Sequence, residues 1–428
     1  MRPTLTPLIL VLVLVAPSPP AAAGKLVTDL VNVTPAGQQA VGLSRWPDLT
    51  ESGAVLAFDS LATDLVPADT NDARDVFVRN TAIPATVRAS VSSGGVQGDN
   101  DSETPSIDAH AHYVAYESRA TNLVPGDTNG VSDVFVFDVW QGKTVRVSVT
   151  DAEGQADARS GDPAINKDGG RYVAFFSTAS NLVPGDVNGV GDVFVRDLRL
   201  GTTTLVSVSD GSTRGTGESY HPAISEDGRW VAFTSDAANL VAGDTNGVAD
   251  VFLRDLRTGT TSRISVSGTG QQADGSSALP SIRGTSVAFT SRATNLVAGD
   301  TNGVQDVFVH HRTSGGTIRV SVGTGGTQAN APSTNPSMGD YTYVAFSSGA
   351  TNLVAGDTNG VDDVFRHNRV SGVTDRWSVE STGGQTGLGP AGQPMINGIG
   401  GSVAFVSSAV GFFPGDPVNT QDVFLRHP

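Results

Sequence analysis

A short phrase, Asp-Val-Phe, occurs seven times and constrains the fold more than any other feature of the sequence. Neighbouring copies are 56 to 59 residues apart, and they begin at Asp75, Asp133, Asp192, Asp250, Asp306, Asp363 and Asp422. A second Asp precedes each copy by six residues, from Asp69 to Asp416. A period near 58 residues that fills 24–428 predicts a single repeat domain and leaves no room for a second one.

Each repeat unit carries four short strand signals. In the fourth unit they lie at 222–224, 230–235, 250–254 and 263–267, with tight Gly-containing turns after the first and third. No segment keeps a helical period. Four antiparallel strands in each of seven units predict an all-β fold, a single seven-bladed β-propeller of four-stranded antiparallel blades. A β-solenoid, whose coils are shorter and parallel, is the alternative.

The two ends of the repeat array predict how the ring closes. The last unit contains only three strands, whereas 30–34 followed by 37–40 matches 264–267 followed by 270–273. We therefore expect an N-terminal strand at about 28–34 to complete the last blade by pairing with residues at about 422–426. Such closure would remove the unpaired strand edges that otherwise favour aggregation.

Residues 1–23 have the pattern of a secretory signal peptide. A positive start is followed by an apolar run over 8–16, three prolines and the small residues 21–23. We expect cleavage near Gly24 and a secreted, extracytoplasmic protein. The chain has no Cys, which excludes a lipid-modified cysteine as anchor, disulfides and thiolate metal sites.

Charge and hydropathy limit the kinds of binding partner that we expect. With 27 Lys and Arg against 43 Asp and Glu, the formal net charge is −16, which is unlike a nucleic-acid-binding protein. No stretch after the signal peptide is long and apolar enough for a membrane helix, so no membrane insertion is expected. We expect a monomer.

The repeat resembles a known family. Residues 225–233 (SEDGRWVAF) and 250–256 (DVFLRDL) are similar to the TolB-like, or WD40-like, bacterial β-propeller repeat, and the resemblance covers all seven units. It implies the propeller fold but little about activity, because that repeat serves many roles. TolB has an additional N-terminal α/β domain that this chain lacks, so the Tol partners are not carried over.

The loop between the second and third strands repeats the pattern Asp-x-Asn-Gly-x-x-Asp. Two carboxylates and an amide oxygen within seven residues are ligands that Ca²⁺ prefers. The alternative is structural, because Asn-Gly forms turns and Asp can accept backbone N–H groups. Under the calcium hypothesis the candidate ligands are Asp127, Asn129, Asp133, Asp186, Asn188, Asp192, Asp244, Asn246, Asp250, Asp300, Asn302, Asp306, Asp357, Asn359 and Asp363.

Strand alternation places these long loops and the Gly/Gln/Ala connections between blades on one face of the ring. Binding residues usually lie on such loops, so we expect an unknown protein or glycan ligand there. No catalytic or cofactor-binding motif is recognised. The hypothesis is a secreted, non-catalytic binding or scaffold propeller. The alternative is a secreted hydrolase or lyase acting on polysaccharide, which would need carboxylates that converge at the channel mouth.

Overall fold

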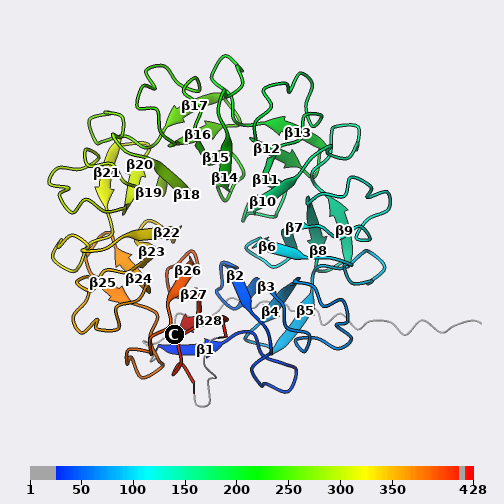
Figure 1. Cartoon of the computed structure of the whole chain (residues 1–428), viewed down its shortest axis with the longest axis horizontal. Helices are drawn as coiled ribbons and strands as arrows, with labels where there is room; N and C mark the ends of the chain where they lie inside the picture. The colour runs from blue at the N-terminus through cyan, green and yellow to red at the C-terminus, as the bar shows by residue number, and fades with distance from the viewer. Residues whose placement is uncertain (1–25, 414–419) are drawn as a thin grey trace, which may run out of the picture.

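Seven four-stranded antiparallel sheets surround a central axis in the computed structural model, which describes residues 26–413 and 420–428 (Figure 1). All 28 strands belong to these sheets, and the described residues contain no helix, so none that could cross a membrane. The chain is therefore an all-β, seven-bladed propeller, as the repeat predicts. The predicted signal peptide lies outside the described residues.

Each blade has the same strand order from the axis outward. The innermost strands are β2 (Ser44–Leu49), β6 (Ser102–Ile107), β10 (Ser160–Ile165), β14 (Ser219–Ile224), β18 (Ser277–Arg283), β22 (Ser333–Met338) and β26 (Ala391–Ile396). The second strands are β3 (Val55–Ser60), β7 (Tyr113–Ser118), β11 (Tyr172–Ser177), β15 (Trp230–Ser235), β19 (Ser286–Ser291), β23 (Tyr343–Ser348) and β27 (Val403–Ser407). The third strands are β4 (Asp75–Asn80), β8 (Asp133–Asp138), β12 (Asp192–Asp197), β16 (Asp250–Asp255), β20 (Asp306–His311), β24 (Asp363–Asn368) and β28 (Asp422–His427). The outermost strands are β5 (Ala85–Arg88), β9 (Lys143–Arg146), β13 (Thr202–Leu205), β17 (Thr260–Arg263), β21 (Gly316–Arg319), β25 (Thr374–Arg376) and β1 (Val27–Leu30).

The outermost strand lies earlier in the sequence than predicted. In blade 4 the prediction was 263–267, whereas β17 pairs Thr260 with Asp255 and Arg263 with Phe252. Beyond Arg263 the N–H of Ile264 still donates to the carbonyl of Val251 at 2.7 Å, and the ladder then ends because the hydroxyl of Ser265 accepts the N–H of Val251 at 3.2 Å. Only the start of 263–267 therefore pairs with β16, and the rest of the predicted strand lies beyond the ladder.

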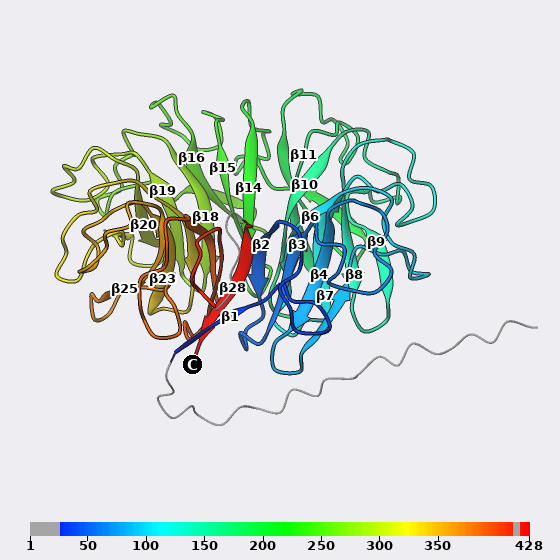
Figure 2. The same ribbon diagram turned by 60° about the horizontal axis from the view of Figure 1, so that its bottom comes forward.

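The ring closes through the N-terminal strand, as predicted. β1 pairs with β28 from Val27 opposite His427 to Leu30 opposite Phe424, and the two lie side by side in Figure 2. The contact continues beyond the strand, since the N–H of Val31 donates to the carbonyl of Val423 at 2.8 Å. Blade 7 is thus built from both ends of the chain.

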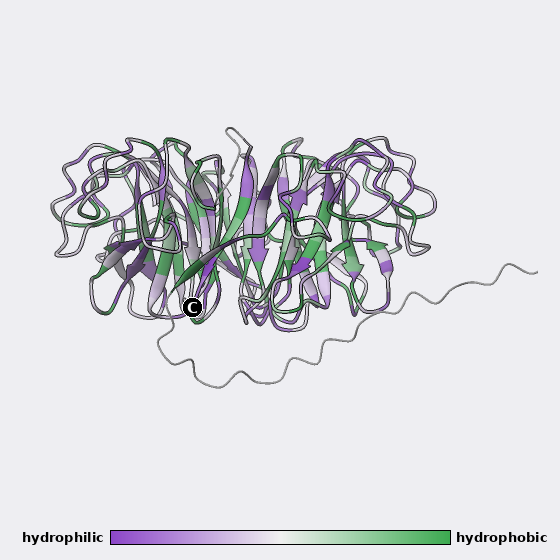
Figure 3. Cartoon of the chain, turned by 90° about the horizontal axis from the view of Figure 1, so that it is seen from below, coloured by the Kyte–Doolittle hydropathy of each residue, from purple (hydrophilic) through white to green (hydrophobic). Residues whose placement is uncertain are grey.

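The hydrophobic core consists of layers between neighbouring blades. One such layer joins Val193 and Val195 of blade 3 to Val231 and Phe233 of blade 4. In each layer an aromatic residue of the second strand, Phe in every blade except blade 2, where it is Tyr116, lies against a phenylalanine of the third; Phe233 is 5.9 Å between ring centroids from Phe252 of β16. Figure 3 shows apolar segments within the strands across the thickness of the disc. The blades therefore form a rigid frame around the axis.

The disc has two different faces. Connections from the second to the third strand, and from the fourth strand to the next blade, lie on what we call the long-loop face. The tight turns after the first and third strands lie on the hairpin face, where β28 also ends (Figure 3).

Candidate functional site

The Asp-x-Asn-Gly-x-x-Asp loops bring their acidic residues together around an arginine. In blade 2, Asn129 Nδ2 donates to Asp133 Oδ2 at 2.9 Å, and Ser148 Oγ donates to Asp133 Oδ1 at 2.6 Å. The Arg146 guanidinium lies 3.5 Å from Asp127 and 3.7 Å from Asp133. Asp133 is completely buried.

Other blades repeat this arrangement. Arginines from the outermost strands contact both carboxylates in blades 4, 5 and 6, namely Arg263 with Asp244 and Asp250, Arg319 with Asp300 and Asp306, and Arg376 with Asp357 and Asp363. In blade 3, Arg214 lies 3.7 Å from Asp186, and Asp192 accepts from Asn188 and Ser207. The amides of Asn246, Asn302 and Asn359 likewise donate to the Asp that begins the third strand.

These contacts favour the structural interpretation of the loops. The chain itself supplies positive charge and hydrogen-bond donors to every candidate pair. Among residues 26–413 and 420–428, no group of three or more acidic or histidine side chains is placed to hold a metal ion. Calcium binding stays a hypothesis.

A different feature sets the channel apart: a β-bulge in all seven innermost strands. In blade 3, Gly161 pairs with Phe176 and Ala164 with Ala174, so the strand has one extra residue between them. Asp162 occupies this bulge with a φ of 53° and is followed by Pro163. Proline is tolerated there because it needs no ladder partner, and a bulge turns a side chain away from its usual direction.

The bulged residues form what we call the channel ring. Each has a left-handed φ between 49° and 54° and precedes a proline, and they are Trp46, Thr104, Asp162, His221, Leu279, Asn335 and Gln393. Left-handed backbone is rare for such residues and costs of order 1–3 kcal/mol per residue. The ring position carries a different residue in every blade, although the proline that follows is the same in all seven.

All seven ring residues line one cavity of about 720 Å³ in the central channel. A volume of this size is typical of small-molecule sites. Trp46 is 41 % exposed within it. The ring is therefore a set of diverse side chains around a ligand-sized space.

Charge is unevenly distributed in the channel. Near Asp162, the buried Glu117 accepts the Asp162 N–H at 3.0 Å and lies 3.5 Å from Arg159. Burial raises the pKa of Asp162, although His221 and Arg159 partly offset it. The opposite wall, formed by Leu279, Asn335 and Gln393, carries no charge at the ring.

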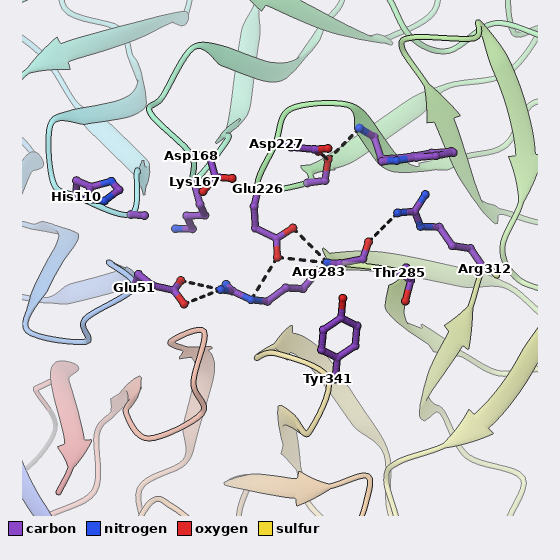
Figure 4. A pocket seen from close by; sticks show the side chains of 14 residues that line it. Glu51, His110, Lys167, Asp168, Glu226, Asp227, Arg283, Thr285, Arg312 and Tyr341 are labelled. Carbon is purple, nitrogen blue, oxygen red and sulfur yellow. Dashed lines mark hydrogen bonds and ion pairs between the residues drawn. The ribbon is translucent and has the colours of Figure 1, made fainter. Parts of the chain in front are cut away.

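Ion pairs span the channel at its hairpin-face end (Figure 4). Arg283 of blade 5 donates to both carboxylate oxygens of Glu51 of blade 1, at 2.8 and 2.7 Å. It also contacts Asp340 at 2.7 Å and Glu226 at 3.4 Å. Burial disfavours its charge, but the hydrogen bonds outweigh burial and raise the pKa of Arg283. The channel is thus crossed by a polar bridge at this end.

A second cation, Lys167, adds polar contacts at the same end of the channel. Lys167 Nζ donates to Asp48 Oδ2 at 2.8 Å and to the carbonyl of Ile107 at 2.7 Å. A further cavity of about 680 Å³ lies at this mouth, where Arg312 stacks 4.0 Å from the Trp230 ring centroid and Tyr341 lies across from it. Carboxylates do converge at the mouth, as a polysaccharide-acting enzyme requires, but Glu51, Glu226 and Asp48 are bound to cations.

The sequence predictions do not include the channel ring. They rest on what the seven units share, whereas the ring is defined by what differs between them. The available signal was the residue before the proline in each first strand, which is never repeated. The long-loop face, where the ligand was predicted to bind, carries none of the residues that line the mouth cavity. The central cavity lies on the axis of the ring.

Fold and channel together define a seven-bladed β-propeller with a ligand-sized cavity on its axis. Among solved structures, it is similar to the β-propeller domain of the Trilobed protease from Pyrococcus furiosus, with a TM-score of 0.54 and 8 % identity over 90 % of this chain and 94 % of that one. It is also similar to an oligogalacturonate lyase in complex with manganese, with a TM-score of 0.52 and 10 % identity over 94 % of this chain and 90 % of that one.

TolB is another solved structure that it resembles. TolB from Acinetobacter baumannii matches with a TM-score of 0.40 and 14 % identity, over 92 % of this chain and 81 % of that chain. At such identities the likeness concerns the fold alone. No protein-family model and no curated protein matches the sequence.

Proposed function

We propose that this chain is a secreted, non-catalytic binding or scaffold propeller that takes its ligand into the central channel. The observation that carries the proposal is the cavity of about 720 Å³, where the otherwise repeated blades present seven different side chains. Diversity at one position of a repeat is what an asymmetric ligand requires, whereas a purely structural ring has no need of it.

The position of the ion pairs favours entry of the ligand from the long-loop face. Because Arg283 and Glu51 bridge the hairpin-face end, the open approach to the ring is from the other side. The exposed side chains of Arg159 and Glu218 lie at that approach. The long-loop face would then be the entrance to the site.

Binding is preferred to catalysis because of how the carboxylates are engaged. General acid–base or nucleophilic catalysis on a polysaccharide needs two carboxyl groups free to act on the glycosidic bond. Asp48 is held by Lys167, and Glu51 and Glu226 by Arg283. Asp162 is the observation that favours the enzyme alternative, because this carboxyl group forms no ion pair among the described contacts.

Binding of calcium to the long loops would be a separate property, in addition to ligand binding in the channel. The Asp and Asn residues of the long loops would hold it only if their arginines gave way. We therefore place structural capping of these loops first and calcium second.

Differential capture tests the proposal. The mature chain would be used to capture molecules from the secreted and envelope fractions of its source, in parallel with Asn335→Trp, which fills the channel, and Thr258→Trp, which alters an exposed hairpin. We expect one bound molecule to be lost with Asn335→Trp, retained with Thr258→Trp and recovered intact. If the Asn335→Trp variant captures the same molecule as wild type, the ligand does not bind in the channel. Cleavage of a captured polysaccharide would favour the enzyme alternative.

A further inference from the structure

The channel ring keeps side chains at a backbone conformation that glycine adopts without strain. The chain contains 51 glycines and uses them at many left-handed turns, yet none of the seven ring positions is Gly. Strain that persists at seven equivalent positions is a mark of function. The side chains themselves must therefore be needed in the channel.

The order of the ring residues separates apolar from polar groups. Going around the axis, Trp46 of blade 1 and Leu279 of blade 5 stand on nearly opposite sides. Thr104, Asp162 and His221 fill the arc between them on one side, and the two amides of Asn335 and Gln393 fill the other. A matching ligand would have two apolar faces and a polar rim.

Three polar groups of the ring have unused hydrogen-bonding capacity among the described residues, and at two of them a side-chain rotation would have to turn a buried atom toward the ligand. Thr104 Oγ1 and His221 Nδ1 are buried and have no hydrogen-bond partner among the described residues. Gln393 Oε1 accepts the N–H of Trp46 at 2.9 Å, which leaves the amide NH₂ of Gln393 to donate. Buried polar atoms without partners are costly, so a ligand that supplies them with hydrogen bonds would gain affinity and specificity.

We infer that the channel ring binds a neutral saccharide, either a short oligosaccharide or the end of a longer chain. This inference rests on the proposed binding function. A pyranose carries hydroxyl groups around its rim, each able to donate and accept, and its C–H faces pack on aromatic and aliphatic side chains. The bridge of Arg283 and Glu51 would stop the chain end, so the saccharide would enter from the long-loop face.

Charge argues for a neutral ligand. The ring holds one carboxyl, that of Asp162, and one imidazole, that of His221, and has no Lys or Arg to match an acidic sugar or phosphate. Arg159, which lines the same cavity, lies 3.5 Å from Glu117. Arg45, which precedes Trp46 in the sequence, pairs with Asp59 and Glu103. A cationic peptide is the competing ligand, since Asp162 could pair with an ammonium group.

A glycan array and calorimetry test the inference. The mature chain would be applied to an array of neutral and acidic glycans, and the best neutral glycan would then be titrated against wild type, Asp162→Asn, Asn335→Ala and the control Asp362→Asn. Asp362 is an exposed carboxyl outside the channel cavity. We expect about tenfold weaker binding for each ring variant and no change for the control. Sugar binding should also alter a fluorescence signal that Trp46→Phe removes.

The outcomes separate the inference from the function on which it rests. Binding only of acidic glycans, or only of the peptide acetyl-Gly-Lys-Gly-amide, with loss in the ring variants, would overturn the saccharide inference and leave the channel site standing. Absence of any neutral glycan ligand would overturn the inference as well. Glycan binding that all ring variants retain would overturn both. Circular dichroism and melting curves of each variant would confirm that it is folded.

Discussion

At each position of the channel ring, the side chain and the backbone conformation oppose one another. Thr104 is the clearest case, because it is β-branched, has a φ of 51° and leaves its hydroxyl without a partner among the described residues. Thr104→Gly should therefore raise the free energy of unfolding by about 1 kcal/mol, although glycine also gains freedom in the unfolded chain. Thermal melting would measure this gain.

Thr258→Gly is the matched control, since Thr258 lies in an exposed turn and is not left-handed. It should leave the melting temperature unchanged or lower it. If Thr104→Gly destabilises as much as Thr258→Gly, the ring is not strained. A more stable Thr104→Gly that binds the ligand less tightly would show that stability is sacrificed for binding at this position.

Buried carboxyl groups give the protein an unusual pH dependence. Burial raises the pKa of Asp59 to about 6 despite Arg74 and Arg45, and that of Asp75 to about 6 despite Ser90 and Arg88. In the unfolded chain both carboxyls have a pKa of about 3.9. Between about pH 4 and pH 6 the folded state therefore holds more protons than the unfolded state, so stability falls as the pH rises through this window.

Melting temperatures should accordingly be higher at pH 5 than at pH 7. Asp75→Asn resembles the protonated carboxyl and should flatten the dependence. A melting temperature that rises from pH 5 to pH 7 in wild type would show that the ion pairs with arginine outweigh burial at these two positions.

At the scale of the blade, the arginine of the outermost strand connects the long loop to the sheet. Arg319 lies 2.9 Å from Asp300 and 3.4 Å from Asp306, and both carboxylates are almost completely buried. Arg319→Met should destabilise the fold by about 3 kcal/mol, because it removes the cation that two buried carboxylates share. Arg257→Met, at an exposed residue, should change stability by less than about 0.5 kcal/mol. Chemical denaturation of the two variants would compare them.

The same loops decide the role of calcium. A site that binds Ca²⁺ only in the folded state would add about 2.7 kcal/mol at a hundredfold excess over Kd. Because a guanidinium group and hydrogen-bond donors of the chain already contact the carboxylates, we expect the wild-type melting curve to be the same in calcium and in chelator. A clear rise in melting temperature with calcium, together with measurable heat of binding, would establish the loops as metal sites.

The blade was predictable where one residue pattern has one structural cause. The second strand Trp230–Ser235 has the predicted bounds, because buried apolar residues and the flanking turns specify it. The outermost strand was misplaced because Ile264 and Val266 alternate with serines as in a strand, although the ladder ends at this point. The bulge at Asp162 could not be predicted, since a left-handed residue other than Gly or Asn leaves little trace in the sequence.

At the scale of the whole molecule, a buried asparagine adds two hydrogen bonds to the closure of the ring by β1 and β28. Asn32 Nδ2 donates to Asp422 Oδ1 at 2.6 Å, and Asn32 Oδ1 accepts the N–H of Val423 at 2.9 Å. In blade 2 a serine, Ser148, makes both contacts with one hydroxyl. Asn32→Ala would leave Asp422 Oδ1 and the N–H of Val423 without partners, while Asp422 Oδ2 would keep the hydrogen bonds from Gln39 and Thr420. We expect a loss of about 2–4 kcal/mol and a lower melting temperature.

Asn32→Ser is the informative control, because it copies the other blades and should keep part of the stability. Deleting 26–36 should have a larger effect, since the edge of β28 would then be exposed and the protein should aggregate on heating. If the shortened chain melts as the full mature chain does, the N-terminal strand does not hold the ring together.

The pairing of β1 with β28 also decides how the ring responds to mechanical force. Val27 lies opposite His427, so the two ends of the chain leave the disc side by side. A load that pulls these ends apart acts on one pair of backbone hydrogen bonds at a time and peels the strands open like a zipper. In a shear geometry the whole ladder would resist together. The blade that completes the ring is therefore the one that tension at both termini would open first.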